Sequence, residues 1–161
     1  MTTLDSLGEM VEWVVQAAEH AENGIYTQAL DESIGFVQEF EREMYREQRG
    51  PDGVAWAPLA PSTIKAKGHS TILVDTGRMF ESLTTPQGTE DTVWMTGDNW
   101  FTFGTSVEYA HFHQTGTKNK DGSPRMVARP HVGVNGQVVS QIGNRLAAAV
   151  ATQFNEGLSN G

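Results

Sequence analysis

The spacing of apolar residues predicts helices at both ends of the chain. Apolar positions recur three or four residues apart from Leu4 to about Glu22 and again from about Thr27 to Glu47. Asn23-Gly24 is a stop signal between these two segments. The apolar stripe of the second segment consists of Leu30, Ile34, Val37, Phe40 and Met44. Gly35 interrupts that segment, so we expect another part of the chain to pack closely against its backbone.

A third helix is predicted near the C-terminus, from about Val138 to Phe154. Its apolar face would consist of Val139, Ile142, Leu146, Val150 and Phe154. The last residues, 156–161, are expected to fray because chain ends are poorly ordered unless something holds them.

The middle of the chain has a different pattern, because 12 of the 17 glycines and all six prolines lie between Gly50 and Gly143. Thr92–Thr96 and Trp100–Thr105 are rich in aromatic and β-branched residues, which predicts two strands joined by a turn at Gly97-Asp98-Asn99. Phe80–Thr85 is predicted to begin as a helical turn and to lead into a third strand. Lys118–Ser123 is polar and contains glycine, which is typical of a surface loop.

These elements predict a single α+β domain over residues 1–161. Residues 1–49 would form the helical N-terminal part, 50–134 a small antiparallel sheet with long ordered loops, and 135–155 the C-terminal helix.

Composition and charge limit the classes of function that fit the chain. The chain has no cysteine, which excludes disulfides, thiolate metal sites and a cysteine nucleophile. Its net charge of −9 argues against a general nucleic-acid binder. The charge is unevenly distributed, with −8 over residues 1–50, −4 over 51–110 and +3 over 111–161. The acidic end of one copy could therefore meet the basic end of another, although acidic solvated helices are the simpler interpretation.

No apolar run reaches the roughly 20 residues of a membrane helix, and we expect a protein made in the cytoplasm.

One segment resembles an enzyme motif. Ile72–Gly77 is an apolar run leading into Asp75-Thr76-Gly77, similar to the catalytic loop of retroviral-type aspartic proteases, in which two subunits each supply one aspartate. Arg78 and the helical pattern that follows do not fit such a loop, and Asp-Thr-Gly is common in turns. We therefore expect no enzyme, with a homodimeric protease using Asp75 as the alternative.

No cofactor or metal site is predicted. His111 and His113 would point the same way on a strand, as two zinc ligands can, but the segment Tyr109–Gln114 more simply alternates between packed and hydrogen-bonded positions. The chain contains no phosphate-binding glycine motif.

Five short motifs in order along residues 34–133 resemble the phage virion morphogenesis, or tail completion, family of tailed bacteriophages and Mu-like prophages. They are Gly50-Pro51-Asp52-Gly53, Trp56-Ala57-Pro58-Leu59, Ile72–Met79, Tyr109-Ala110 with His113-Gln114-Thr115-Gly116, and Ala128-Arg129-Pro130. The chain departs from the family pattern at Met79, Thr115 and Met126-Val127.

The resemblance implies a non-enzymatic virion protein that completes the tail or neck and supports head–tail joining as part of a ring, of six or twelve copies. Its partners would be neck, connector or tail-tube proteins, with no membrane and at most passing contact with phage DNA. It would lie at the head–tail junction or tail end after synthesis in the host cytoplasm. A transient assembly factor absent from the finished particle is an alternative.

The motif residues are the candidate site. Trp56 could pin the proline-rich segment, Asp75 or Thr76 could cap a helix, and Arg129 before Pro130 suits a fixed polar contact. The family-motif and assembly candidates are Trp56, Pro58, Leu59, Asp75, Thr76, Gly77, Arg78, Tyr109, His113, Gln114, Gly116, Arg129 and Pro130. Lys118, Lys120 and Arg125 form a candidate partner-contact loop, with a solvated loop as the simpler interpretation.

Overall fold

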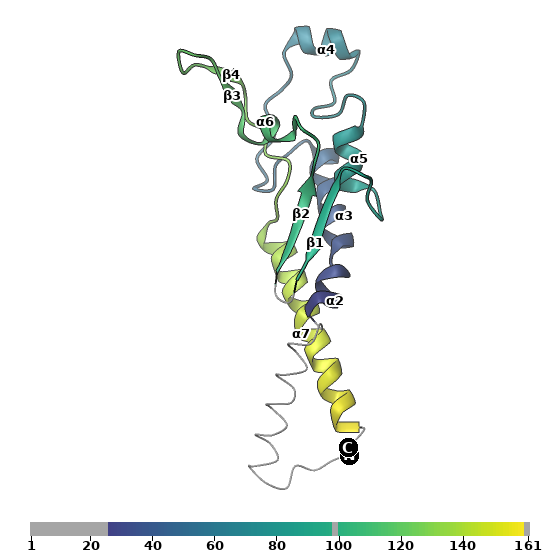
Figure 1. Cartoon of the computed structure of the whole chain (residues 1–161). Helices are drawn as coiled ribbons and strands as arrows, with labels where there is room; N and C mark the ends of the chain where they lie inside the picture. The colour runs from purple at the N-terminus through teal and green to yellow at the C-terminus, as the bar shows by residue number, and fades with distance from the viewer. Residues whose placement is uncertain (1–25, 98–99, 160–161) are drawn as a thin grey trace. The chain divides into compact units, whose positions relative to one another are not determined.

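The computed structural model of the chain describes residues 26–97 and 100–159, and it confirms the α+β class (Figure 1). The helix predicted from Leu4 to Glu22 lies outside the described residues. The helices are α2 (Tyr26–Asp31), α3 (Ile34–Glu47), α4 (Pro61–Lys67), α5 (Arg78–Thr84), α6 (Ala110–Thr115) and α7 (Gly136–Ser159). The strands are β1 (Thr92–Thr96), β2 (Phe101–Thr105), β3 (Thr117–Lys118) and β4 (Pro124–Met126).

The strands form two small two-stranded sheets. β1 pairs with β2, as the sequence predicted, and β3 pairs with β4 in antiparallel register with Thr117 opposite Met126. The predicted polar loop is therefore the turn of the β3–β4 hairpin. Among the described residues, no helix is long and apolar enough to cross a membrane.

The described residues form two compact units. The first contains those within Met1–Ile34, Met95–Thr102 and Val139–Gly161, and the second contains Gly35–Trp94 and Phe103–Val138. The single-domain organisation stays a prediction.

Polar contacts connect the parts of the first unit. Thr27 Oγ1 donates to the carbonyl of Gly97 at 3.2 Å, and Thr96 Oγ1 donates to Asp31 at 2.8 Å. Arg145 of α7 lies 3.9 Å from a carboxylate oxygen of Glu32.

The second unit holds the larger apolar core. Tyr45, Trp56, Ile72 and Leu83 are buried together. The Tyr45 ring meets Trp56 edge to face at a centroid distance of 5.3 Å. A neighbouring cluster consists of Met79, Val107 and Ala110. These contacts hold α3, α5, α6 and the proline-rich segment around one centre.

The predicted helix over residues 27–47 is wrong in one respect, because it is broken between α2 and α3. The Ser33 hydroxyl donates to the carbonyl of Ala29 at 2.7 Å, which competes with helical backbone bonding at this point. The close packing predicted at Gly35 is not found within the described chain, where no atom lies within 4 Å of the position that a Cβ would take there.

The C-terminal helix is longer than predicted. α7 runs to Ser159, so residues 156–159 are helical rather than frayed, and no proline interrupts them. Its buried face begins at Val138 and Ile142, whereas Val139, assigned to that face from the sequence, is 56% exposed.

The predicted third strand after Phe80 is absent from the described part of the second unit. α5 ends at Thr84, and Pro86, which lacks an N–H, follows it. Gln87 and Gly88 then take positive φ angles of 72° and 75°, which no strand accepts. These residues form a turn that leads into β1.

Candidate functional site

The motif residues of the second unit meet in a network of hydrogen bonds that joins distant parts of the chain. Trp56 Nε1 donates to the carbonyl of Pro130 at 2.7 Å. Arg129 donates from Nε to the carbonyl of Ala57 at 2.8 Å and from Nη2 to that of Pro58 at 3.1 Å. The proline-rich segment and the Ala-Arg-Pro segment, more than 70 residues apart in sequence, are thereby fixed to each other.

Gln114 extends this network from the end of α6. Its Oε1 accepts from the backbone N–H of His131 at 2.9 Å and of Val132 at 3.2 Å, and its Nε2 donates to the Val132 carbonyl at 3.0 Å. The backbone N–H of Arg129 donates to the carbonyl of His113 at 2.7 Å. The Gln114 side chain therefore pairs with the backbone of His131 and Val132, which lie in no helix or strand.

Gly116, which follows α6, fits this arrangement for a steric reason. Its φ of 72° is in the left-handed region, and a Cβ there would lie 2.7 Å from the carbonyl oxygen of Met126. Only glycine allows α6 to end so close to β4.

The Asp75-Thr76-Gly77 segment turns the chain into α5. Gly77 is the residue before the helix, with a φ of 92°, and as a glycine it supplies no side-chain cap. Of the two predicted caps, Thr76 reaches the first turn only weakly. Thr76 Oγ1 accepts only a long contact, 3.5 Å, from the Arg78 N–H. Asp75 itself is exposed.

Arg78 anchors this turn to the strand region. Its Nε and Nη2 donate to the two carboxylate oxygens of Asp91 at 2.7 and 2.8 Å, a bidentate pair. The Ser106 hydroxyl also contacts this carboxylate at 3.3 Å. The hydrogen bonds from Arg78 are the main reason that the pKa of Asp91 is lowered.

The strand geometry that would let His111 and His113 act as two zinc ligands is not found. His111 and His113 lie on α6 rather than on a strand, so their side chains point in different directions. His113 lies edge to face with Tyr109 and with His131, at centroid distances of 6.1 and 6.4 Å. Burial lowers the pKa of His131 to about 4, so this ring is neutral near pH 7. Among the described residues, no group of three or more His, Asp or Glu is placed to hold a metal ion.

Glu41 is an acid buried in the second unit. Its side chain is 0% exposed, Oε1 accepts from the Gly133 N–H at 3.4 Å, and Oε2 has no hydrogen-bond partner within the described chain. Burial raises the pKa of Glu41 well above its ordinary value. Sequence analysis missed this residue, although Val37, Glu41 and Met44 follow helical spacing on one buried face.

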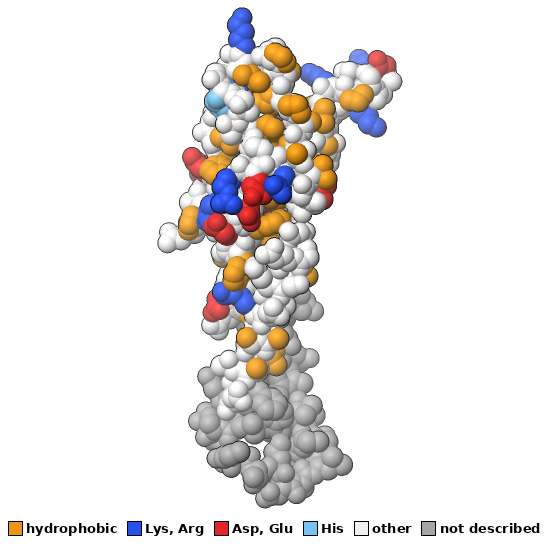
Figure 2. All heavy atoms as spheres, turned by 180° about the vertical axis from the view of Figure 1, so that it is seen from behind, with side chains coloured by type: hydrophobic (Ala, Val, Ile, Leu, Met, Phe, Trp, Pro, Cys, Tyr) orange, Lys and Arg blue, Asp and Glu red, His pale blue; other side chains and the backbone are white. Residues whose placement is uncertain are grey.

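A groove opens beside the network. It has a volume of about 580 Å³, and its lining includes Leu59, Val74, Tyr109, His113 and Arg129. Tyr109 and His113 also line a second hollow of about 480 Å³, which they share with Phe112, Arg125 and Met126. Figure 2 shows hydrophobic side chains near the upper end of the view, with lysine or arginine side chains at the tips of the two projections there.

The structure therefore brings together most of the predicted residues and separates others. Trp56, Pro58, Gln114, Arg129 and Pro130 belong to the network. Leu59, Asp75, Thr76, Gly77, Arg78, Tyr109, His113 and Arg129 line the groove. Lys118 and Lys120 lie on the exposed β3–β4 hairpin with Arg125, outside the groove lining. Whether these residues act in assembly stays a prediction.

The second unit thus presents a hydrogen-bonded joint between distant segments beside a groove with apolar lining. The model of the phage virion morphogenesis family matches residues 16–151, and the chain belongs to that family. Membership gives it a role in building the phage virion. No curated protein and no solved structure matches the chain significantly.

Proposed function

We propose that the chain completes the tail or neck of a tailed bacteriophage as one subunit of an oligomeric ring and supports head–tail joining. The observation that carries the proposal is the family match over residues 16–151, which includes every motif residue of the network. The ring would contact neck, connector or tail-tube proteins at the head–tail junction or the tail end.

The distribution of charge along the sequence supports a ring. A closed ring needs heterologous contacts between two different faces of each subunit. The chain has no lysine or arginine before Arg42 but nine acidic residues in that stretch, whereas residues 111–161 carry a net charge of +3. Two parts of opposite charge are suited to joining successive copies.

We also propose that the protein works without catalysis. Asp75, the one candidate nucleophile or acid from the sequence, lies exposed in the turn before α5. A paired aspartate of a protease active site needs a second carboxylate close by to share its proton. In the homodimer alternative this second carboxylate is the Asp75 of another copy, whereas Arg78 and the start of α5 directly after Gly77 do not fit such a catalytic loop.

The test is to interrupt the gene in the phage that encodes the chain. Filled heads and separate tails should accumulate, and adding the purified protein to the lysate should join them into infectious particles. Normal particles without the protein, or heads that fail to fill, would contradict the proposal. Mass spectrometry of purified particles then decides between a resident ring and a transient assembly factor.

A further inference from the structure

We propose that the groove beside Tyr109 and His113 receives the acidic N-terminal segment, residues 4–22, of a second copy of this chain. The inference rests on the proposed ring and names the contact between its neighbouring subunits. It is carried by the shape of the groove, by its charge and by the composition of the segment.

The groove has the form of a peptide site. Its apolar side chains include Leu59, Val74 and Met79, and Tyr109 and His113 line both this groove and the second hollow. Tyr109 and Phe112 remain 38% and 45% exposed. Its volume of about 580 Å³ is within the range of sites that bury a ligand. An amphipathic helix laid into such a groove is a common mode of peptide recognition.

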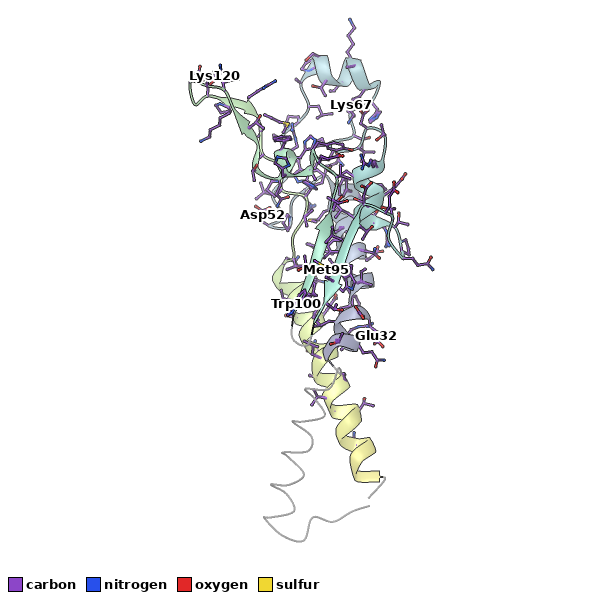
Figure 3. The ribbon with its side chains drawn as sticks, in the orientation of Figure 1. Glu32, Asp52, Lys67, Met95, Trp100 and Lys120 are labelled. Carbon is purple, nitrogen blue, oxygen red and sulfur yellow. The ribbon has the colours of Figure 1, made fainter. Side chains whose placement is uncertain are left out.

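The groove carries a net positive charge, because Lys67, Arg78 and Arg129 line it together with one carboxylate, that of Asp75. Arg129 is bonded to two carbonyl oxygens, and no salt bridge joins it to a carboxylate in the described chain. Lys67 lines the groove on the α4 side, where its ammonium donates to a backbone carbonyl at 2.7 Å. Arg78 differs, because Asp91 neutralises it. Figure 3 shows Lys67 and Lys120 at the same end of the second unit, on separate projections.

The N-terminal segment has the complementary composition. Residues 4–22 contain five acidic residues and no lysine or arginine, and the sequence predicts an amphipathic helix there. The apolar positions include Leu4, Leu7 and Val14. A carboxylate beside Arg129 or Lys67 would gain a charged partner, while the apolar face would cover Leu59 and Val74.

The absence of cysteine from the chain allows a clean test by disulfide trapping. Ser6→Cys places a thiol in the segment, and Thr63→Cys places one in the groove lining, at an exposed residue of α4. The two full-length variants, one carrying a mass tag, are mixed under mild oxidation. Ser140→Cys, an exposed position of α7, replaces Thr63→Cys as the matched control.

We expect the mixed disulfide of Ser6→Cys with Thr63→Cys to form at least about tenfold faster than with the control, because docking raises the effective thiol concentration. Lys67→Glu in the groove partner should slow it, most at low salt. Equal rates with the control, in a sample whose oligomers are unchanged by sedimentation, would overturn the inference while leaving the proposed ring intact.

A doubly substituted chain, Ser6→Cys with Thr63→Cys, tests whether the groove is instead occupied by the N-terminal segment of the same chain. If its disulfide forms within one chain, and mixing with excess untagged chain of wild-type sequence does not slow it, the segment occupies its own groove and the second-copy proposal is wrong. Disulfides that link different chains, and that dilution suppresses, support it. The gene interruption described above tests the ring role independently of either result.

Discussion

At the scale of single residues, Trp56 joins the apolar core to the hydrogen-bond network. Its ring is 6% exposed and packs on Tyr45, and its Nε1 donates to Pro130. Trp56→Ala should therefore lower the free energy of unfolding by about 3–5 kcal/mol, the range for deleting a large buried aromatic. Urea denaturation followed by circular dichroism measures the change.

Two further variants separate packing from hydrogen bonding at this position. Trp56→Phe keeps much of the ring and removes the bond to Pro130, so it should cost about 1 kcal/mol for the lost bond in addition to any repacking. Trp100, which is 51% exposed, is the control, and Trp100→Ala should cost much less than Trp56→Ala. Equal losses at the two tryptophans would mean that Trp56 is not a core residue in solution.

Asp75 lies exposed in a turn, which gives a clear expectation for the protease alternative. Incubation with an unstructured peptide between pH 4 and pH 7 should leave the peptide intact, because the Asp75 turn leads directly into α5 and does not form a loop that two protease subunits could bring together. Mass spectrometry of the peptide is the readout. Cleavage that pepstatin blocks and Asp75→Asn abolishes would restore the protease alternative.

Glu41 predicts a specific dependence of stability on pH. Its pKa in the folded state lies well above the ordinary value of 4.5, because burial disfavours the charged form. Its contribution to stability is therefore present at low pH and lost as pH rises from about 4.5 through the folded pKa. Glu41→Gln removes this titration, so its stability relative to the wild type should increase between pH 5 and pH 9.

Denaturation curves at pH 5, 7 and 9 measure this effect, with Glu90→Gln at an exposed position as the control. The control should show no comparable change with pH. A stability difference between Glu41→Gln and the wild type that is constant across the series would mean that Glu41 is not buried as a neutral acid.

The sequence allowed some of these residues to be predicted and not others. Tryptophan before prolines indicates an anchored segment, and Arg before Pro indicates an extended backbone that can hold a fixed contact. The buried positions of Glu41 and His131 were not predictable, because their burial depends on long-range contacts such as the approach of Gly133 to α3.

At the scale of elements, glycine-to-alanine variants test how closely other parts of the chain pack against α3, α7 and the end of α6. Gly35 in α3 and Gly143 in α7 are exposed, and no atom of residues 26–97 or 100–159 lies within 4 Å of the place that a Cβ would take at either residue. Gly35→Ala and Gly143→Ala should each raise the free energy of unfolding by about 0.5–1 kcal/mol through helix propensity. Gly116→Ala should lower it, because its Cβ would meet the Met126 carbonyl at 2.7 Å. Thermal melts of the three variants make the comparison, and stabilisation by all three would contradict the close approach at Gly116.

Element types followed from local pattern, while their ends depended on contacts that the pattern does not contain. β1 was predicted with its observed bounds because aromatic and β-branched residues fill it. The break before α3 depends on one hydroxyl of Ser33, and the turn after α5 on positive φ angles near Gln87. The groove could not be predicted, because its lining comes from α4, α5, α6 and the segments between them.

At the scale of the whole molecule, the uneven charge makes self-assembly the property to test. Lys118, Lys120 and Arg125 are exposed on the β3–β4 hairpin, so reversing all three to Glu should leave the fold intact. If acidic and basic parts of successive copies meet, the triple variant should assemble more slowly, and most at low salt, because screening shortens to about 8 Å at physiological ionic strength. Light scattering and sedimentation across a salt series measure the rate and the final size.

Matched variants distinguish a charged contact from a general effect of net charge. Replacing the same three residues by Gln removes the positive charge without adding repulsion, so it should slow assembly less than Glu does. Reversing Asp5, Glu9 and Glu12 to Lys should slow assembly by itself and partly restore it when combined with the triple Glu variant, because the two reversed parts are again complementary. If the assembly rate recovers only when both sets of charges are reversed, the acidic N-terminal residues and the basic hairpin face each other between copies. If all variants assemble at the wild-type rate at every salt concentration, the uneven charge serves solvation alone, and the buried apolar contacts of the groove would have to select the neighbouring subunit without electrostatic help.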